Sequence, residues 1–191
     1  MSAERLVRAF SGWFVTRQVI KHLASVEGLE NLPAEVSFVL APNHRSYFDH
    51  FVMAILVRAV TGRPVWFLTK RESFIGTLPR LWSKAWYGIP VDRENPNADT
   101  LRAVRAVFLR GDTLCVNPEG TRNIEEKLLP FHAGAFRFAL AESAPIIPVA
   151  MTGTAEVLQK GDLWFRRGGK VRVVFGAPLS RGLDPVWWTQ G

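Results

Sequence analysis

Apolar residues in this chain first follow a long helical pattern and then form short runs separated by further helical patterns. Residues 3–25 have the periodicity of a helix. One side of that helix carries six apolar residues, Leu6, Val7, Phe10, Trp13, Phe14 and Ile20. Arg17 and Lys21 interrupt this side, so the amphipathic stripe is imperfect. Such a helix suits both a bilayer interface and packing against a domain, and the pattern alone does not separate the two.

From residue 36 onward, short apolar runs alternate with helical patterns, as is typical of an α/β domain. Six runs are predicted strands: Val36–Ala41, Val65–Leu68, Gly88–Val91, Thr113–Val116, Ile146–Met151 and Val171–Phe175. Four segments are predicted helices: Phe51–Val60, Leu78–Trp86, Ala98–Arg110 and Ala133–Ser143. Asn97 is the predicted N-cap of the third of these helices, and Gly111 is its predicted C-terminal stop. We therefore expect a mixed, mostly parallel sheet flanked by helices.

The size of the chain favours a single domain. Its 191 residues, 48% of them apolar, are enough to bury a core and few enough for one compact unit. We predict an N-terminal amphipathic helix in residues 1–26 and one domain in residues 27–191.

The longest stretch without Asp, Glu, Lys or Arg has 13 residues, Ser143–Ala155. A bilayer span needs roughly 18 to 20, so we expect no transmembrane segment, and the N-terminus also lacks the pattern of a secretory signal.

The net charge of +7 is compatible with nucleic acid, membrane phosphates or an anionic substrate. Six cations lie between Lys160 and Arg181, against the single acid Asp162, and Trp164 and Phe165 lie among them. Basic residues interleaved with aromatic ones suit an anionic lipid surface. A solvated basic hairpin on an ordinary enzyme explains the same stretch equally well.

Cysteine and histidine usage gives no indication of a metal or a disulfide. Cys115 is the only cysteine and lies in an apolar run, so we predict a core residue rather than a nucleophile. The four histidines, His22, His44, His50 and His132, have no metal-ligand spacing. We expect neither a metal nor another cofactor.

The segment Asn43–Asp49 lies between a predicted strand and a predicted helix, where open α/β sheets bind ligands. His44 and Asp49 would be about 140° apart on a regular helix. Across a turn, however, the carboxylate can fold back to a ring nitrogen. It then fixes the tautomer and leaves the other nitrogen free to take a proton from a hydroxyl. Taken alone, the spacing is explained more simply by Asp49 as a helix N-cap and His44 as a loop residue.

A second polar segment, Asn117–Asn123, again follows a predicted strand. Gly120 allows close approach of the backbone, Thr121 offers a hydroxyl, and Arg122 offers a planar fork for phosphate oxygens. These features are typical of an anion site. A local ion pair between Glu119 and Arg122 is the simpler alternative.

Two further segments complete the pattern. Gly88–Arg93 ends in Arg93, whose guanidinium can converge on the same phosphate. Ala144–Val149 is a predicted buried strand bounded by prolines, which contributes shape rather than chemistry.

Together these segments resemble the glycerolipid acyltransferase family, which includes the bacterial lysophosphatidic acid acyltransferases. The family has four blocks in a set order, and all four occur here: Asn-His-x4-Asp at 43–49, Gly-x-x-x-Asp-Arg at 88–93, Pro-Glu-Gly-Thr-Arg at 118–122 and Pro-Ile-x-Pro-Val at 145–149. The resemblance covers residues 27–178 and implies that residues 27–191 form an acyltransferase domain. Two positions depart from the family pattern, because Asn117 stands where an aromatic residue is common and Asn123 where serine is common.

The resemblance also implies roles for particular residues. His44 would be the catalytic base and Asp49 its orienting partner. The acyl-acceptor site would be formed by Arg93, Glu119, Gly120, Thr121 and Arg122, with both arginines on a phosphate. Lys70, after the second predicted strand, would assist in binding phosphate or donor.

The implied reaction is transfer of a fatty acyl group from acyl-CoA or acyl carrier protein to a lysophospholipid hydroxyl. The best-fitting acceptor is 1-acyl-glycerol-3-phosphate, which would give phosphatidic acid. Glycerol-3-phosphate, other lysophospholipids and amino-acid lipids are alternative acceptors. Because the chain has no Gly-x-Ser-x-Gly elbow, and Ser46 has no evident base of its own, we expect direct transfer without an acyl-enzyme.

We expect such an enzyme on the cytoplasmic face of a membrane, as a peripheral or monotopic protein on an anionic surface, with no nucleic-acid partner. Two rival functions fit parts of the same sequence. One is a hydrolase of acyl thioesters or lipids that uses the same His–Asp pair. The other is a non-catalytic, basic, aromatic-rich module that binds membranes.

Overall fold

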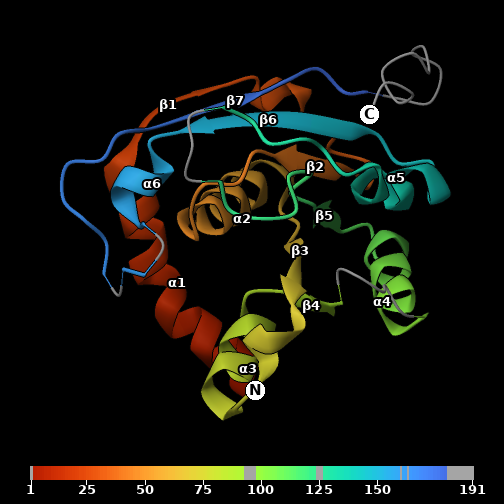
Figure 1. Ribbon diagram of the computed structural model, residues 1–191, viewed down its shortest axis with the longest axis horizontal. Coiled ribbons are helices and arrows are strands. Elements are labelled where there is room, and N and C mark those ends of the chain that lie inside the picture. Colours follow the sequence, from red (N-terminus) through yellow and green to blue (C-terminus); the bar gives the residue numbers. More distant parts are fainter. Residues whose placement is uncertain (1, 93–97, 124–126, 160, 163, 180–191) are drawn as a thin grey trace.

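Seven strands form one mixed, mostly parallel sheet in the computed structural model, which describes residues 2–92, 98–123, 127–159, 161–162 and 164–179 (Figure 1). The strands are β1 (Leu23–Glu27), β2 (Val39–Pro42), β3 (Val65–Lys70), β4 (Gly88–Val91), β5 (Thr113–Cys115), β6 (Ile146–Thr152) and β7 (Val171–Phe175). Their order is β1-β7-β6-β2-β5-β3-β4, and every neighbouring pair is parallel except β6 and β7. The predicted fold class is therefore confirmed.

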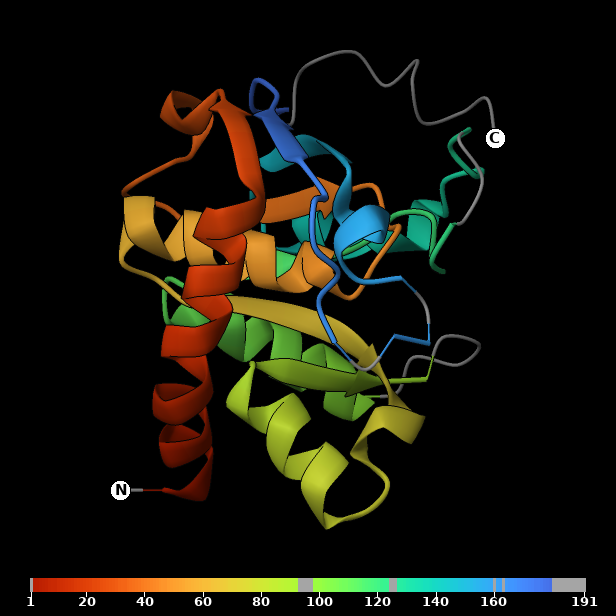
Figure 2. The ribbon, with the colours of Figure 1, turned by 90° about the vertical axis from the view of Figure 1, so that its left-hand side faces the viewer.

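Helices cover both faces of this sheet. They are α1 (Ala3–His22), α2 (Phe48–Thr61), α3 (Thr77–Ala85), α4 (Ala98–Leu109), α5 (Arg137–Ala141) and α6 (Thr154–Val157), with the 3-10 turns η1 (Leu29–Asn31), η2 (Arg71–Phe74) and η3 (Ala133–Phe136). Successive residues of a strand point to opposite faces. Accordingly, Leu40 belongs to the core formed with α1 and α2, whereas Val39 belongs to the core formed with α4 and α5. Figure 2 shows α1 and α3 side by side, in agreement with their contacts.

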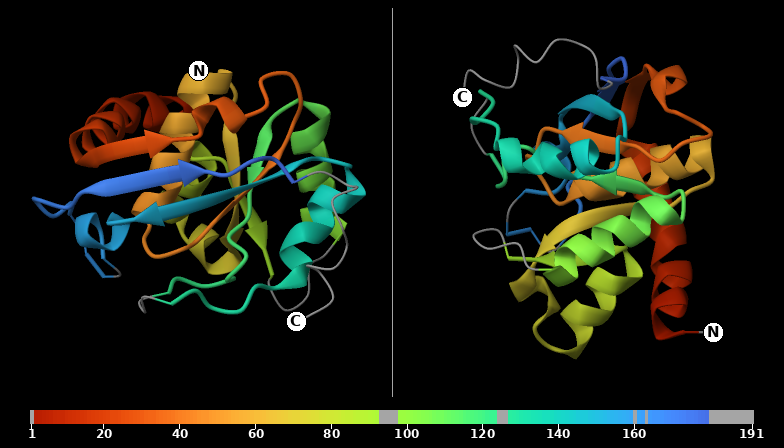
Figure 3. Two further views of the ribbon diagram at one scale, coloured as in Figure 1. Left: turned by 90° about the horizontal axis from the view of Figure 1, so that it is seen from above. Right: turned by 90° about the vertical axis from the view of Figure 1, so that its right-hand side faces the viewer.

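The largest difference from the predicted elements is at the end of the first helix. The helical pattern predicts a helix as far as residue 25, but α1 ends at His22 and residues 23–27 form β1. Leu23 to Glu27 pair in parallel with β7, more than 140 positions later in the chain. This pairing outweighs a local helical pattern, and β1, β7 and β6 lie side by side in Figure 3. The proposed domain boundary at residue 26 falls inside β1.

The remaining elements differ less from the predictions. β4 and β7 have the predicted bounds, and the other predicted strands differ by at most three residues at an end. The predicted helix 133–143 consists of η3 followed by the short α5, while α6 was not predicted. Gly111 ends α4 as expected, because it adopts a φ of 77° and its N–H donates to Phe108 O at 3.0 Å. Asn97 lies outside the described residues.

Helix α1 packs on the domain through a face that differs from the predicted stripe. Val15 and Val19 are buried, together with His22. Of the six residues in the predicted stripe, four are exposed: Leu6, Phe10, Trp13 and Ile20. The helix therefore both packs on the domain and presents large apolar side chains outward. Within the described part of the chain, no helix is long and apolar enough to cross a bilayer.

The sheet topology brings the carboxyl ends of four strands to one edge. Strands β2, β3, β4 and β5 run parallel to their neighbours, so their carboxyl ends face the same side. The segments that follow β2 and β5 begin with Asn43 and Val116, and β3 ends with Lys70. The blocks that follow β2 and β5 thus lie at the edge where open α/β sheets bind ligands, and β4, which forms most of the block 88–93, ends at the same edge.

Candidate active site

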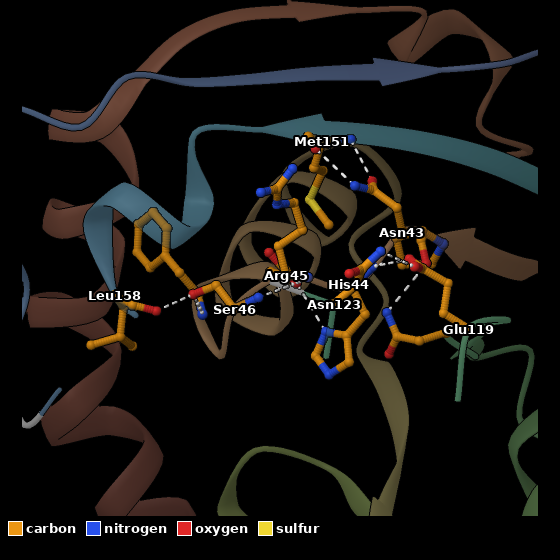
Figure 4. A network of polar contacts seen from close by, with 12 residues as sticks. Asn43, His44, Arg45, Ser46, Glu119, Asn123, Met151 and Leu158 are labelled. Atoms are coloured by element: carbon orange, nitrogen blue, oxygen red, sulfur yellow. Dashed lines mark hydrogen bonds and ion pairs between the residues drawn. The ribbon is translucent and has the colours of Figure 1, made fainter. Parts of the chain in front are cut away.

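The loop that carries His44 is attached to the sheet by Asn43. The Asn43 side chain donates from Nδ2 to Met151 O at 2.9 Å and accepts the Met151 N–H at 2.7 Å (Figure 4). This amide reproduces the hydrogen-bond pattern of a strand beyond the end of β2. The backbone immediately before His44 is therefore held against β6.

Asp49 binds three donors from this loop. Its Oδ2 atom accepts the ring Nδ1 of His44 at 2.9 Å and the N–H groups of Arg45 and Ser46 at 2.8 and 2.9 Å. Both side chains of the pair are buried. A carboxylate oxygen only accepts, so Nδ1 carries the proton and Nε2 is the unprotonated nitrogen. The carboxylate thus orients the imidazole and satisfies the loop amides together. Asp49 lies in the first turn of α2, and the N-cap position belongs to Tyr47.

Ser46 fixes the opposite side of the loop. Its hydroxyl, fully buried, donates to Leu158 O beyond α6 and accepts the Phe48 N–H at 2.9 Å. Both bonds are structural, and they connect the start of α2 to the segment after β6. The hydroxyl is therefore already engaged within the protein.

Glu119 joins the two polar segments into one unit. Its Oε1 accepts the backbone N–H of His44 at 2.9 Å, while Oε2 accepts the Leu129 N–H at 3.0 Å and Asn123 Nδ2 at 3.1 Å. In return, the Asn123 N–H donates to His44 O at 2.7 Å (Figure 4). No ion pair joins Glu119 to Arg122 among the described residues, in contrast to the simpler alternative. The Glu119 carboxylate therefore binds the backbone of His44. Its predicted role in acceptor binding stays a prediction.

Gly120 is required by the shape of the second segment. It has a φ of 65°, and a Cβ added there would lie 2.9 Å from Cδ2 of His132. The N–H of His132 also donates to Pro118 O at 2.9 Å. His132, to which residue spacing assigned no role, is therefore an exposed imidazole that borders this segment.

Arg122 lies over the ring of Tyr47, with 3.9 Å from its Cζ atom to the ring centroid. Its Nη1 atom is buried and has no hydrogen-bond partner within the described part of the chain. Thr121 and Lys70 are exposed, and Lys70 ends β3. Arg93 lies outside the described residues. The structure therefore joins Arg122 to the His44 loop through Tyr47, a contact that residue spacing does not indicate.

A second histidine borders the first. The ring centroid of His50 lies 5.2 Å from that of His44 and 4.7 Å from that of Phe67. Burial, and after it the electrostatic effect of His44, lowers the pKa of His50 from 6.5 to about 4. Asp49 and the Asn117 side chain act in the opposite direction on this pKa. His50 is therefore neutral near pH 7. Its position beside the site was not predicted, because its contact with Phe67 joins two different elements of the fold.

An apolar cavity of about 780 Å³ opens next to this pair of rings. Helices α1, α2 and α3 and strand β3 line it, through Phe14, Phe51, Trp82, Trp86 and Phe67 among others. Tyr47 and His50 lie in its wall, and both also contact the polar site. The cavity is thus continuous with the His44 loop.

Possible metal ligands and the single cysteine are the remaining groups with chemistry of their own. Among residues that the structure describes, no group of three or more His, Cys, Asp or Glu side chains is arranged to hold a metal ion. Cys115 is buried in β5, and burial raises the pKa of its thiol. It is a core residue.

The protein is an α/β domain whose sheet edge carries a histidine oriented by a carboxylate. An arginine and an apolar cavity border the loop of this histidine. A family model described as Acyltransferase matches residues 24–152. The chain belongs to this acyltransferase family, as the four sequence blocks predict.

Known relatives agree with this assignment. The chain is 30% identical over 159 residues to the chloroplastic 1-acyl-sn-glycerol-3-phosphate acyltransferase BAT2 of Brassica napus, covering 81% of this chain and 44% of that protein. It is 29% identical over 152 residues to the 1-acyl-sn-glycerol-3-phosphate acyltransferase of Bacillus subtilis, covering 80% and 71%. The crystal structure of the 1-acyl-sn-glycerophosphate (LPA) acyltransferase PlsC from Thermotoga maritima superposes with a TM-score of 0.68 at 25% identity, covering 91% and 70%. The chain thus spans less than half of the Brassica protein.

Proposed function

We propose that this chain transfers a fatty acyl group from an acyl thioester to the free hydroxyl of 1-acyl-glycerol-3-phosphate. The observation that carries the proposal is the buried His44–Asp49 pair, which assigns the proton of a neutral imidazole to Nδ1 and leaves Nε2 as an acceptor, next to the segment that carries Arg122. The names of the relatives support the acceptor, since they act on 1-acyl-sn-glycerol-3-phosphate.

The proposed step is a direct acyl transfer. Nε2 of His44 takes the proton of the acceptor hydroxyl as its oxygen attacks the thioester carbonyl carbon. The carbon–sulfur bond breaks, and the departing thiolate takes the proton from the imidazolium. Asp49 stabilises the imidazolium between these two proton transfers. The products are phosphatidic acid and the free thiol of CoA or acyl carrier protein, with no acyl-enzyme.

The acceptor phosphate is proposed to bind Arg122. Its buried Nη1 needs an acceptor, and a phosphate oxygen is a strong one. The Thr121 hydroxyl and the backbone at Gly120 lie next to it in the chain, and we propose that Arg93 and Lys70 add positive charge. Glu119 contributes by holding the His44 backbone. A fatty acyl chain of a substrate fits the aromatic-lined cavity, which adjoins the base through His50.

The membrane is proposed as the source of the lipid substrate. Phe10 and Trp13 on α1, Leu78 on α3 and Trp164 are exposed, and helices α1 and α3 both line the cavity. Arg17 and Lys21 on α1 are exposed as well. Aromatic and basic side chains of this kind suit an anionic interface, so we propose peripheral binding on the cytoplasmic face of a membrane.

The test is an assay of purified chain with acyl-CoA or acyl carrier protein and 1-acyl-glycerol-3-phosphate. Phosphatidic acid is measured by mass spectrometry and free thiol by a colorimetric reagent. We expect equal amounts of both products, and no thiol release when the acceptor is omitted. His44→Ala should abolish transfer while the far-ultraviolet circular dichroism is unchanged.

Four outcomes would contradict the proposal. Thiol release without an acceptor would indicate a hydrolase. Vesicle binding without turnover by either donor would indicate a membrane-binding module. Normal turnover by His44→Ala, or an acyl group covalently bound to Ser46 or Cys115, would refute the mechanism.

A further inference from the structure

We propose that Tyr47 is a positioning residue for the acceptor phosphate: its ring holds Arg122 in place and separates the phosphate from the acyl chain. This inference rests on the proposed function. Tyr47 lies within the first sequence block. It is part neither of the His44–Asp49 pair nor of the segment Asn117–Asn123.

The contact with Arg122 is the first observation. The guanidinium carbon lies 3.9 Å from the ring centroid, well within the range of a cation–π interaction. No carboxylate within the described part of the chain forms an ion pair with Arg122. The buried Nη1 of this guanidinium has no partner within the described part of the chain, so it is available for a phosphate oxygen.

The second observation concerns how the ring itself is held. Tyr47 occupies the N-cap position of α2 with helical dihedral angles and makes no side-chain capping bond. Its neighbours are anchored on both sides, since Ser46 bonds to Leu158 O and Asp49 binds the loop amides. The backbone that carries the ring is therefore held by the same bonds that hold the His44 loop. We infer that the ring in turn limits how far Arg122 can move from the base.

The position of Tyr47 at the cavity is the third observation. The ring lines the apolar cavity and is 50% exposed, although its other contact is a charged group. Its side chain thus contacts the arginine and also forms part of the wall proposed for the acyl chain. A lysophospholipid bound with its phosphate on Arg122 would present its hydroxyl toward His44, on the same loop as Tyr47.

Two substitutions test the role of the ring. Tyr47→Leu keeps an apolar wall but removes the π face, whereas Tyr47→Phe keeps both. For the leucine variant we expect the KM for 1-acyl-glycerol-3-phosphate to rise about 2- to 30-fold, the range of a lost cation–π contact, with kcat within about twofold. Monoacylglycerol, which has no phosphate, should show no such change in KM. Tyr47→Phe should restore the wild-type KM for the phosphate acceptor.

A double-mutant cycle separates positioning from a general structural effect. In an Arg122→Ala background, Tyr47→Leu should cause no further rise in KM, because the ring acts through the arginine. The matched control is the other tyrosine, Tyr87, whose ring centroid lies 4.4 Å from Cζ of Arg8. Tyr87 immediately precedes β4, at the amino end of that strand. Tyr87→Leu should leave the acceptor KM unchanged.

Additive effects in the cycle, or equal changes for both acceptors, would overturn the inference. Direct binding of a short-chain lysophosphatidic acid, measured by calorimetry, distinguishes this failure from failure of the proposed function. If the wild type forms no phosphatidic acid but Tyr47→Leu still weakens this binding, the positioning role stands and the reaction falls. If transfer is normal and binding is unaffected by Tyr47→Leu, the positioning role falls.

Discussion

The His44 loop and helix α1 border the same cavity but are built in opposite ways. Asp49 and Ser46 of the loop, and Glu119 of the segment that holds it, are buried, and each binds two or more groups of the protein. In α1, by contrast, Phe10 and Trp13 extend into solvent. Catalysis requires reacting groups that are held in a fixed geometry. Binding to a lipid surface, by contrast, requires apolar side chains that the rest of the protein leaves exposed. The difference is consistent with the proposal of a fixed site for the reaction beside an exposed apolar surface for a lipid.

The largest expected effect is at Asp49. Replacing Asp49 by Asn should lower kcat by about 10³- to 10⁴-fold, since an amide no longer fixes the His44 tautomer or stabilises the imidazolium. Initial rates of phosphatidic acid formation measure this. The thermal unfolding midpoint serves as the control for folding. A variant that keeps a tenth or more of the wild-type kcat would show that orientation of His44 does not depend on this carboxylate.

The rigid character of the loop is tested at Glu119. Glu119→Ala removes the acceptor of three donors, at His44, Leu129 and Asn123, of which the first and last are buried. Each buried donor left without a partner costs about 1–3 kcal/mol, so the free energy of unfolding should fall by about 2 kcal/mol or more. Urea denaturation measures this change, with the exposed Glu72→Ala as the matched control. Equal stability of the two variants would mean that the loop is held by other contacts.

His50, at the boundary between the two regions, should make stability depend on pH. Its pKa is about 4 in the folded chain against an ordinary 6.5, so the unfolded chain binds a proton that the folded chain does not. Stability should therefore fall as the pH is lowered from about 6.5 to 4, by up to about 3 kcal/mol. Denaturation curves across this window should show a smaller loss for His50→Phe. Identical pH profiles for both proteins would contradict the pKa shift.

The smallest expected effect is on α1. Trp13→Ser should change the free energy of unfolding by no more than about 0.5 kcal/mol, because the side chain is exposed. Its affinity for anionic vesicles should nevertheless fall by about three- to tenfold, through lost burial of the indole in the interface. Vesicle co-sedimentation measures this, with Val36→Ser as a control at an exposed apolar residue outside α1. Unchanged vesicle affinity would show that α1 is not the contact surface.

Local sequence patterns were sufficient for much of this structure. β4 and β7 have their predicted bounds because short apolar runs between turn signals leave few alternatives. The His44–Asp49 contact could likewise be expected, since five residues across a turn place the two side chains within reach. The four ordered blocks also identified the family. These features all depend on residues close together in the chain, or on a recurring motif.

Tertiary structure decided what distant residues share. Leu23–Glu27 became a strand because β7 pairs with it, and Glu119 reached the backbone of His44 because β2 and β5 are neighbours in the sheet. The contacts of Tyr47 with Arg122 and of His50 with Phe67 arise in the same way. Residue spacing carries no information about such pairs. Sheet order and helix packing bring them together, and those depend on burying the whole core at once.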